Sequence, residues 1–493
     1  MADTLVLGID QGGSGSRAVL LDRTGAVRGY GYRPVARLYP RPGWVEQRPA
    51  AVARSVREAL DEAIARAGCA PAAIVACGIT SQRDTVFAWD ARTGRPIGNA
   101  ITWQDLRTVP LVAETDRWEC ATERRARLGQ FPGPYCSAMH MAWRMRHDPA
   151  FRRAAEHGTL RVSLSAGWLI QALGHPAEHA LDYSLLQAMT VFDPRRRALW
   201  EEWLDYLNLP RAALPAPRPT LHHFGTLRIG DAHVPVTAMI TDQQAALFGY
   251  DCRAPGEAVA THGTASFVNV VAGPIAPPQG VCKTYLAWEI AGTPTYALEA
   301  DMTVTGAVVR WLIQMRLIRH AGDLDALARV TPHSDGVVFV PAFTGLGVPD
   351  EDRSARGAIL GVTLGTTPGH IARAFFESIG CQLRAILDTM EQEGNLAIGE
   401  LRVGGGLARS DTACQIQADV AGVRIVRAAD TETSVRAAAL LAGLAAGVWA
   451  RPEALPRLLD HGADTFEPRL APEARAALLA RWQRAVERTR GWA

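Results

Sequence analysis

The chain has 493 residues, of which 48% are hydrophobic and 21% are charged, and this composition excludes a wholly disordered protein. A formal net charge of +2 provides no global field that would select nucleic acid or an anionic membrane, so we expect neither partner. No apolar run reaches the roughly 18 residues of a membrane span, and the start MADTLVLGID lacks the basic region of a signal peptide. We therefore expect a cytoplasmic protein of two or three domains.

The N-terminal segment alternates short strands with tight turns. Residues 4–9, TLVLGI, predict a buried strand that ends at Asp10. The turn QGGSGS and the apolar run SRAVLLD follow, so a second strand comes after the glycines. This order excludes a dinucleotide-binding fingerprint, which requires a helix directly after the glycines. Residues 49–68 then predict a helix and residues 72–82 a strand.

The pattern of the first strands returns in the second half of the chain. After a largely helical middle, residues 234–240 predict a strand, with a helix starting near Asp242. Residues 256–271 then repeat the strand, turn and strand of residues 4–22. This repeat predicts two related halves, residues 1–250 and 251–493.

The remaining C-terminal elements complete the second half. Residues 401–426 predict a strand, a glycine turn, a helix capped by Ser410 and another strand. Residues 431–447 predict a helix of small residues, and residues 473–490 predict a closing amphipathic helix.

Two carboxylates at strand ends carry the first chemical signal. Asp10 could form an Asx-turn and Asp242 a helix N-cap, but each lies beside a turn or helix start whose backbone N–H groups can bind an anion. Ser14 or Thr264 could donate to a phosphate oxygen, and Arg17 adds positive charge. Phosphoryl transfer needs one carboxylate for Mg²⁺ and another to accept the proton of the attacking hydroxyl. Asp10 suits the first role and Asp242 the second.

A second cluster is suited to a polyol. Arg83 and Asp84 in SQRDT could hydrogen-bond neighbouring hydroxyls, while the Trp103 indole covers CH groups and Tyr135 adds a hydroxyl or a ring edge. The alternatives are a solvated surface ion pair and core aromatic residues. Lys283 is the only lysine, fits neither a Walker A loop nor a protein-kinase lysine, and is interpreted as a surface residue.

Several longer motifs resemble the FGGY family of carbohydrate kinases, most closely its glycerol kinase branch. VPAFTGLGVP, residues 340–349, and GAILGVTLGTTPGHIARAFFES, residues 357–378, follow the family signature, while ITSQRDT, ITWQD and TDQQAALFG resemble the glycerol branch. The resemblance implies an α/β fold of two ribonuclease H-like domains of the actin and hexokinase type, with ATP in the cleft between them. It also implies a homo-oligomer, a dimer or a tetramer.

The resemblance assigns a role to individual residues. Asp242 matches the catalytic base, and Asp10 and Asp242 match the residues associated with Mg²⁺. The resemblance assigns larger sets of residues to the polyol pocket and to the ATP site. The residues matching the polyol pocket are Arg83, Asp84, Trp103, Tyr135, Asp242, Gln243 and Phe267. The residues matching the ATP site are Gly12, Ser14, Arg17, Thr264, Gly306, Arg310, Gly405, Gly406 and Ser410.

Some positions depart from the family pattern. Asp84 stands where glycerol kinases carry glutamate, one methylene longer, and Arg310 replaces a glutamine near the phosphates. The run GGSGS, residues 12–16, has fewer hydroxyls than the family loop, and Gly404 replaces an aspartate. A shorter carboxylate at Asp84 leaves space for a larger ligand.

The sequence therefore predicts an ATP- and Mg²⁺-dependent kinase that phosphorylates a terminal hydroxyl of a small polyol, with glycerol as the first candidate and glycerol 3-phosphate as its product. A kinase for erythritol, another polyol or a ketose is the nearest alternative. An ATP-switched protein, or a catalytically weak ATP-binding sensor, is the alternative from another class.

Overall fold

The N-terminal half of the chain is built on a mixed seven-stranded sheet. The computed structural model describes residues 4–429, 432–457 and 462–493. The strand order is β3-β2-β1-β5-β15-β14-β9, in which β1 to β3 pair antiparallel while β1, β5 and β15 are parallel neighbours. The strands are β1 Leu5–Gln11, β2 Gly15–Leu21, β3 Val27–Pro34, β5 Ile74–Ser81, β9 Gly174–Pro176, β14 Leu221–Ile229 and β15 Ala232–Thr241.

The parallel register of this sheet decides where the polar strand ends meet. Asp10 pairs with Thr80 between β1 and β5, and Thr241 pairs with Ser81 between β15 and β5. The three strands therefore end at one edge of the sheet. Ligands of open α/β sheets bind at the carboxyl ends of the parallel strands, and Asp10 and Asp242 both lie there.

The C-terminal half repeats this plan with one addition. Its sheet has the order β18-β19-β17-β16-β22-β23-β24, again with antiparallel strands followed by the parallel set β16, β22 and β23. The antiparallel hairpin of β18 and β19 extends its edge. The strands are β16 Ala258–His262, β17 Ser266–Gly273, β18 Lys283–Ile290, β19 Thr293–Met302, β22 Glu400–Gly405, β23 Arg424–Arg427 and β24 Asp464–Phe466. The predicted repeat of one α/β plan is confirmed.

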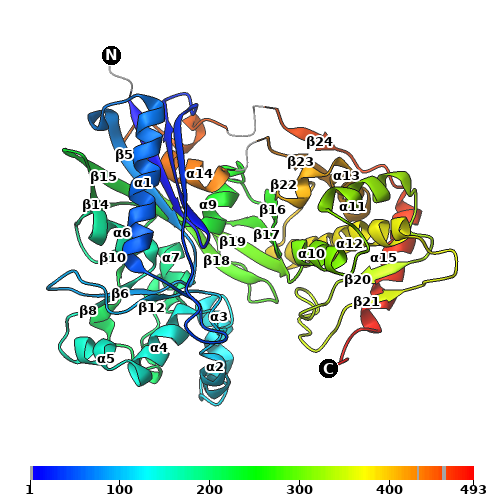
Figure 1. Cartoon of the computed structure of the whole chain (residues 1–493), viewed down its shortest axis with the longest axis horizontal. Coiled ribbons are helices and arrows are strands. Elements are labelled where there is room, and N and C mark those ends of the chain that lie inside the picture. Colours follow the sequence, from blue (N-terminus) through cyan, green and yellow to red (C-terminus); the bar gives the residue numbers. More distant parts are fainter. Residues whose placement is uncertain (1–3, 430–431, 458–461) are drawn as a thin grey trace.

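Fifteen α-helices pack around these sheets in the described residues (Figure 1). They are α1 Pro49–Ala67, α2 Val109–Thr115, α3 Arg124–Leu128, α4 Ser137–His147, α5 Pro149–Glu156, α6 Ser165–Leu173, α7 Tyr183–Ala188, α8 Glu201–Tyr206, α9 Asp242–Gly249, α10 Gly306–Gln314, α11 Ala321–Val330, α12 Pro368–Gly394, α13 Asp411–Ala421, α14 Thr433–Ala445 and α15 Pro472–Glu487. No helix in these described ranges is long and apolar enough to cross a bilayer.

Small strands, several within the predicted helical middle, correct that expectation. They are β4 Glu46–Gln47, β6 Phe87–Asp90, β7 Ala100–Ile101, β8 Leu160–Ser163, β10 Ala180–Asp182, β11 Phe192–Asp193, β12 Ala198–Leu199, β13 Ala216–Arg218, β20 Val338–Val340 and β21 Ala358–Leu360. All ten pair in two-stranded ribbons, because short segments between helices find partners only in the tertiary structure. The closing helix α15 ends at Glu487, three residues before the predicted end.

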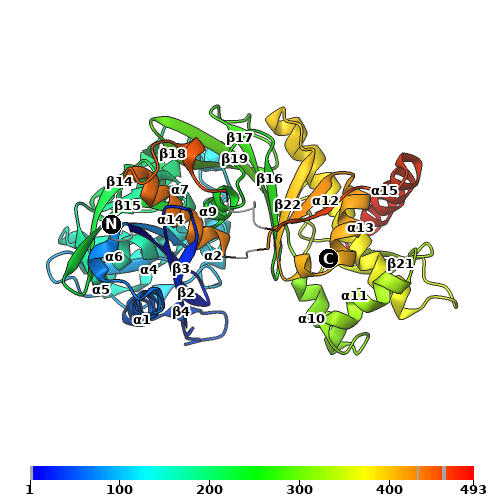
Figure 2. The same ribbon diagram turned by 90° about the horizontal axis from the view of Figure 1, so that it is seen from above.

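Helix α14 lies between β23 and β24 of the second sheet in sequence but packs on the first sheet. Figures 1 and 2 show this orange helix beside the blue N-terminal strands. A Cβ atom added at Gly8 or Gly78 would lie 2.1 Å from Val435 O or 1.9 Å from Ala438 O, so only glycine allows this approach. Thr431, the first residue of the predicted helix, lies outside the described residues. Because α14 returns to the first sheet, a simple division of the chain at residue 250 stays a prediction.

Gly78→Ala tests this close packing. The added methyl group must displace the backbone of α14, so we expect a loss of about 1–3 kcal/mol in the free energy of unfolding, measured by denaturant unfolding. Gly399→Ala is the matched control, because nothing lies within 4 Å of a Cβ atom there. Equal effects of the two substitutions would contradict the packing argument.

Candidate active site

Two carboxylates and one arginine lie at the carboxyl edge of the first sheet. The Asp10 carboxylate on β1 lies 3.6 Å from the Arg17 guanidinium on β2, and Arg17 Nε lies 2.8 Å from the carboxylate of Glu432. Burial raises the pKa of Asp10 to about 7, against the opposing effect of Arg17 and with a further increase from Asp242. Asp10 and Asp242 are thus close enough to interact electrostatically, as phosphoryl-transfer chemistry requires.

Arg83 connects this edge to the second sheet. Its Nη1 atom donates to both carboxylate oxygens of Glu299, at 3.0 Å each, and its Nε lies 3.9 Å from Asp242 Oδ1. Glu299 is fully buried on β19, and the rings of Phe267 and Tyr285 lie 5.8 and 5.2 Å from the guanidinium carbon. Glu299 of the C-terminal sheet therefore binds Arg83, which the N-terminal half contributes to the predicted polyol pocket.

Sequence reasoning missed Glu299. An acidic side chain in the middle of the apolar strand segment YALEA, residues 296–300, was the available signal. A buried carboxylate requires a partner, but the sequence does not indicate which arginine supplies it.

Asp84 is buried beside Arg83, so the alternative of a solvated surface ion pair is wrong. Burial raises the pKa of Asp84 to about 7, while Arg83 and Lys283 oppose this shift. Its backbone adopts a left-handed φ of 61°, a conformation that is uncommon for residues other than glycine. Asp84 Oδ1 and Gln243 Oε1 are both buried and have no hydrogen-bond partner. Two predicted substrate residues thus present acceptors that the protein does not satisfy.

The three predicted aromatic residues occupy different parts of the site. Phe267 packs on Arg83. Burial raises the pKa of Tyr135, whose hydroxyl also interacts with Lys283 and Asp84. Trp103 is 46% exposed, and its indole nitrogen lies 3.5 Å from the position of a Cβ atom at Gly13. Phe267 thus lies by Arg83 and Tyr135 interacts with Asp84, whereas Trp103 lies next to the glycine turn.

Lys283 is not a simple surface residue, which corrects the expectation from sequence. Only 25% of its side chain is exposed, and Nζ lies 2.9 Å from Asp301 Oδ1 and 3.7 Å from Glu299 Oε1. The antiparallel pairing of β18 with β19 places Lys283 opposite Glu299. The only lysine of the chain therefore lies beside the Arg83–Glu299 pair.

The predicted ATP-site residues lie on tight turns. In the first half, Gly12 N donates to Gly15 O at 2.9 Å, which leaves Ser14 exposed at the tip of the turn. In the second half, Gly306 N at the start of α10 donates to Gly263 O at 3.0 Å, and a Cβ atom at Gly306 would lie 2.6 Å from that oxygen. Thr264 is exposed on the same turn, so its hydroxyl is free to meet a phosphate.

The third turn follows β22. Gly405 has a φ of 89°, and Gly406 N donates to His262 O at 2.9 Å. Ser410 caps α13, as predicted, by accepting from Ala413 N at 2.9 Å. Arg310 is exposed on α10. A Cβ atom at Gly404 would overlap the Tyr250 hydroxyl, which explains why an aspartate does not occur here.

The donor set suits Mg²⁺ bound together with phosphates. In the described ranges, no group of three or more His, Cys, Asp or Glu side chains is placed to hold a metal ion. Mg²⁺ is commonly held by one or two carboxylates together with substrate phosphates and water. Asp10 and Asp242 supply two carboxylates, and the glycine turns with Arg17 suit the phosphates.

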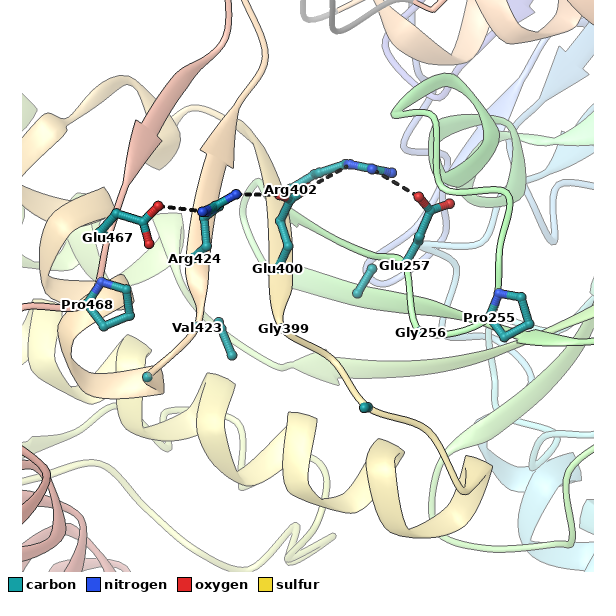
Figure 3. Close-up of a pocket in the computed structure, with 13 residues that line it drawn as sticks. Pro255, Gly256, Glu257, Gly399, Glu400, Arg402, Val423, Arg424, Glu467 and Pro468 are labelled. Atoms are coloured by element: carbon teal, nitrogen blue, oxygen red, sulfur yellow. Dashed lines mark hydrogen bonds and ion pairs between the residues drawn. The ribbon is translucent and has the colours of Figure 1, made fainter. Parts of the chain in front are cut away.

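The second sheet also carries a surface groove that is separate from the candidate active site (Figure 3). It lies at the amino ends of β16, β22 and β23, opposite the glycine turns. A chain of ion pairs crosses it, from Glu467 through Arg424, Glu400 and Arg402 to Glu257. Because these charges satisfy one another, we do not assign catalysis to this groove.

Asp84→Asn tests the burial of this carboxyl group. The pKa of the Asp84 carboxyl group is about 7 in the folded protein and near 3.9 in the unfolded chain. The free energy of unfolding therefore falls as the pH rises from about 4 to 7. We expect Asp84→Asn to raise Tm by a few degrees at pH 8 and by much less at pH 5, measured by calorimetry. Asp90→Asn, at a carboxylate whose pKa is lowered by hydrogen bonds, is the control and should not stabilise the protein at pH 8.

Comparisons with known proteins agree with this geometry. The models of the FGGY family of carbohydrate kinases match the N-terminal domain at residues 5–249 and the C-terminal domain at residues 258–446. Glycerol kinases of Symbiobacterium thermophilum and Aromatoleum aromaticum are each 40% identical over 494 positions, covering 99% of both chains.

Solved structures of carbohydrate kinases are also similar to this chain. A glycerol kinase of Plasmodium falciparum with ADP superposes with a TM-score of 0.93 at 26% identity, over 99% of this chain and 98% of the other. A xylulose kinase of Rhodospirillum rubrum, at a TM-score of 0.86, 23% identity and 98% coverage of each chain, shares the fold. With its sheet-edge carboxylates and glycine turns, the chain belongs to the FGGY family of carbohydrate kinases.

Proposed function

We propose that this carbohydrate kinase transfers the γ-phosphoryl group of ATP to a terminal hydroxyl of glycerol and forms glycerol 3-phosphate. The observation that carries the proposal is the pair of unpartnered buried oxygens on Asp84 and Gln243, the residues that directly follow Arg83 and Asp242 in sequence. Buried acceptors of this kind are costly unless a donor satisfies them, and the hydroxyl groups of a polyol are such donors. The relatives named glycerol kinases support glycerol as the substrate.

Each part of the site then has a role. Asp84, Gln243 and Arg83 orient the hydroxyl groups, and Asp242 accepts the proton of the reacting hydroxyl. Burial raises the pKa of Asp242, which makes its carboxylate a stronger base, and the neighbouring Arg83 opposes this effect.

The remaining residues hold the nucleotide. Asp10 would hold Mg²⁺, and the turns at Gly12, Thr264, Gly306 and Gly405 would hold ATP. When bound, Mg-ATP supplies the phosphoryl group with its negative charge neutralised.

A larger polyol or a ketose is the second candidate. Aspartate at position 84 is one methylene shorter than glutamate, and its Oδ1 atom is left without a partner. A shorter carboxylate at this position would favour a ligand longer than glycerol.

We also propose a cytoplasmic location and a homo-oligomer of two or four copies. All eight cysteines are free thiols, which supports a reducing compartment. The oligomer follows from the family resemblance alone, and gel filtration with light scattering measures it.

Asp242→Asn tests the catalytic base. An amide cannot accept the hydroxyl proton, so we expect ADP release with glycerol to fall by roughly 100- to 10,000-fold in kcat, with little change in KM. Asp231→Asn, on the surface turn between β14 and β15, is the control. Retained activity in Asp242→Asn would contradict the assigned role.

Glu299→Gln tests the contact between the two sheets. Arg83 would lose its bidentate partner and shift toward Asp242, so we expect KM for glycerol to rise roughly tenfold and stability to fall by about 3–5 kcal/mol. Steady-state kinetics and denaturant unfolding measure the two effects. Glu289→Gln, in a partly exposed ion pair with Arg197, should change KM little; an unchanged KM in Glu299→Gln would contradict the role of Arg83.

A further inference from the structure

The hairpin of β18 and β19 brings a second ion pair to the polyol end of the site. Lys283 Nζ lies 2.9 Å from Asp301 Oδ1, and 3.7 Å from the same Glu299 that binds Arg83. The Lys283–Asp301 pair therefore adjoins the Arg83–Glu299 pair. None of the proposed catalytic steps uses it.

This pair interacts with the predicted substrate residues. Lys283 acts electrostatically on both Asp84 and Tyr135, and Asp301 acts on Tyr135. The side chains of Lys283 and Asp301 are 25% and 29% exposed, so both remain accessible to a small molecule. Asp84 Oδ1, nearby, has no partner. The Lys283 ammonium group thus provides a donor, and the carboxyl groups of Asp301 and Asp84 provide acceptors, in addition to the Arg83–Asp242 pair.

The balance of charge limits the class of ligand. The polyol end combines two cations with four carboxylates. The cations are Arg83 and Lys283, and the carboxylates are Asp84, Asp242, Glu299 and Asp301. An acidic sugar would place a further negative charge beside these carboxyl groups. Neutral hydroxyl groups fit better, because they donate to carboxylates and accept from an ammonium group.

We propose that Lys283, held in place by Asp301, hydrogen-bonds a substrate hydroxyl beyond the three of glycerol and so allows the enzyme to accept neutral polyols of four or more carbons in addition to glycerol. The inference rests on the proposed polyol kinase function and names the residue that sets substrate length. Asp84, one methylene shorter than glutamate, would leave room for the longer ligand.

Kinetics with glycerol and erythritol test the proposal. In Lys283→Met, which keeps the length of the side chain but removes its charge and donors, we expect the ratio of kcat/KM for erythritol over glycerol to fall roughly 10- to 100-fold. Asp301→Asn should lower the same ratio in the same direction, because Lys283 loses its anchor. Arg197→Met, which breaks the ion pair with Glu289 near the other end of β18, is the control and should leave the ratio unchanged.

A direct binding measurement uses the single lysine. Protein labelled with ¹³C at lysine Cε gives one resonance, from Lys283. We expect erythritol to shift this resonance in a saturable way, and glycerol to shift it less. This measurement needs neither ATP nor a variant, so it does not depend on how well Lys283→Met folds.

The outcomes separate the inference from the function on which it rests. If no polyol causes ADP release by the unaltered enzyme, the proposed function is wrong and the inference falls with it. The function stands and the inference is overturned in two cases. In the first, polyols are phosphorylated but the Lys283 resonance does not move. In the second, Lys283→Met lowers kcat/KM equally for erythritol and for glycerol.

Discussion

A guanidinium held between two sheets organises this active site. Arg83 follows a strand of the first sheet, and its bidentate partner Glu299 is fully buried in the second. A buried carboxylate without a cation would be strongly destabilising, and removing one partner from such a pair typically costs about 3–5 kcal/mol. This pair therefore fixes Arg83 beside Asp242 and links the proposed polyol pocket to the position of both halves of the chain.

Close packing between backbones provides the scaffold for that pair. Helix α14 lies against β1 and β5 because Gly8 and Gly78 carry no side chain. These are the strands that end at Asp10 and at the Arg83–Asp84 segment. The helix thus supports the strands that position the carboxylates, although in sequence it lies between β23 and β24 of the second sheet.

The neighbouring charges give two equally buried aspartates different proposed roles. Asp10 and Asp84 both have a pKa raised to about 7 by burial. Asp10 faces Arg17 at the glycine turn, where Mg-ATP would bind. Asp84 lies with Lys283 and Tyr135 at the polyol end, where a neutral hydroxyl is the suitable partner. The neighbouring charges, not the residue type, distinguish the two positions.

The sequence by itself determined the two related α/β halves, the strand ends that carry Asp10 and Asp242, and the glycine turns, because strand periodicity and turn chemistry are local properties. Burial of Asp84, the Arg83–Glu299 pair, the pocket position of Lys283 and the return of α14 to the first sheet were decided by the tertiary structure alone. Each depends on which segments distant in sequence pack together, and a buried charge acquires its partner only when they do.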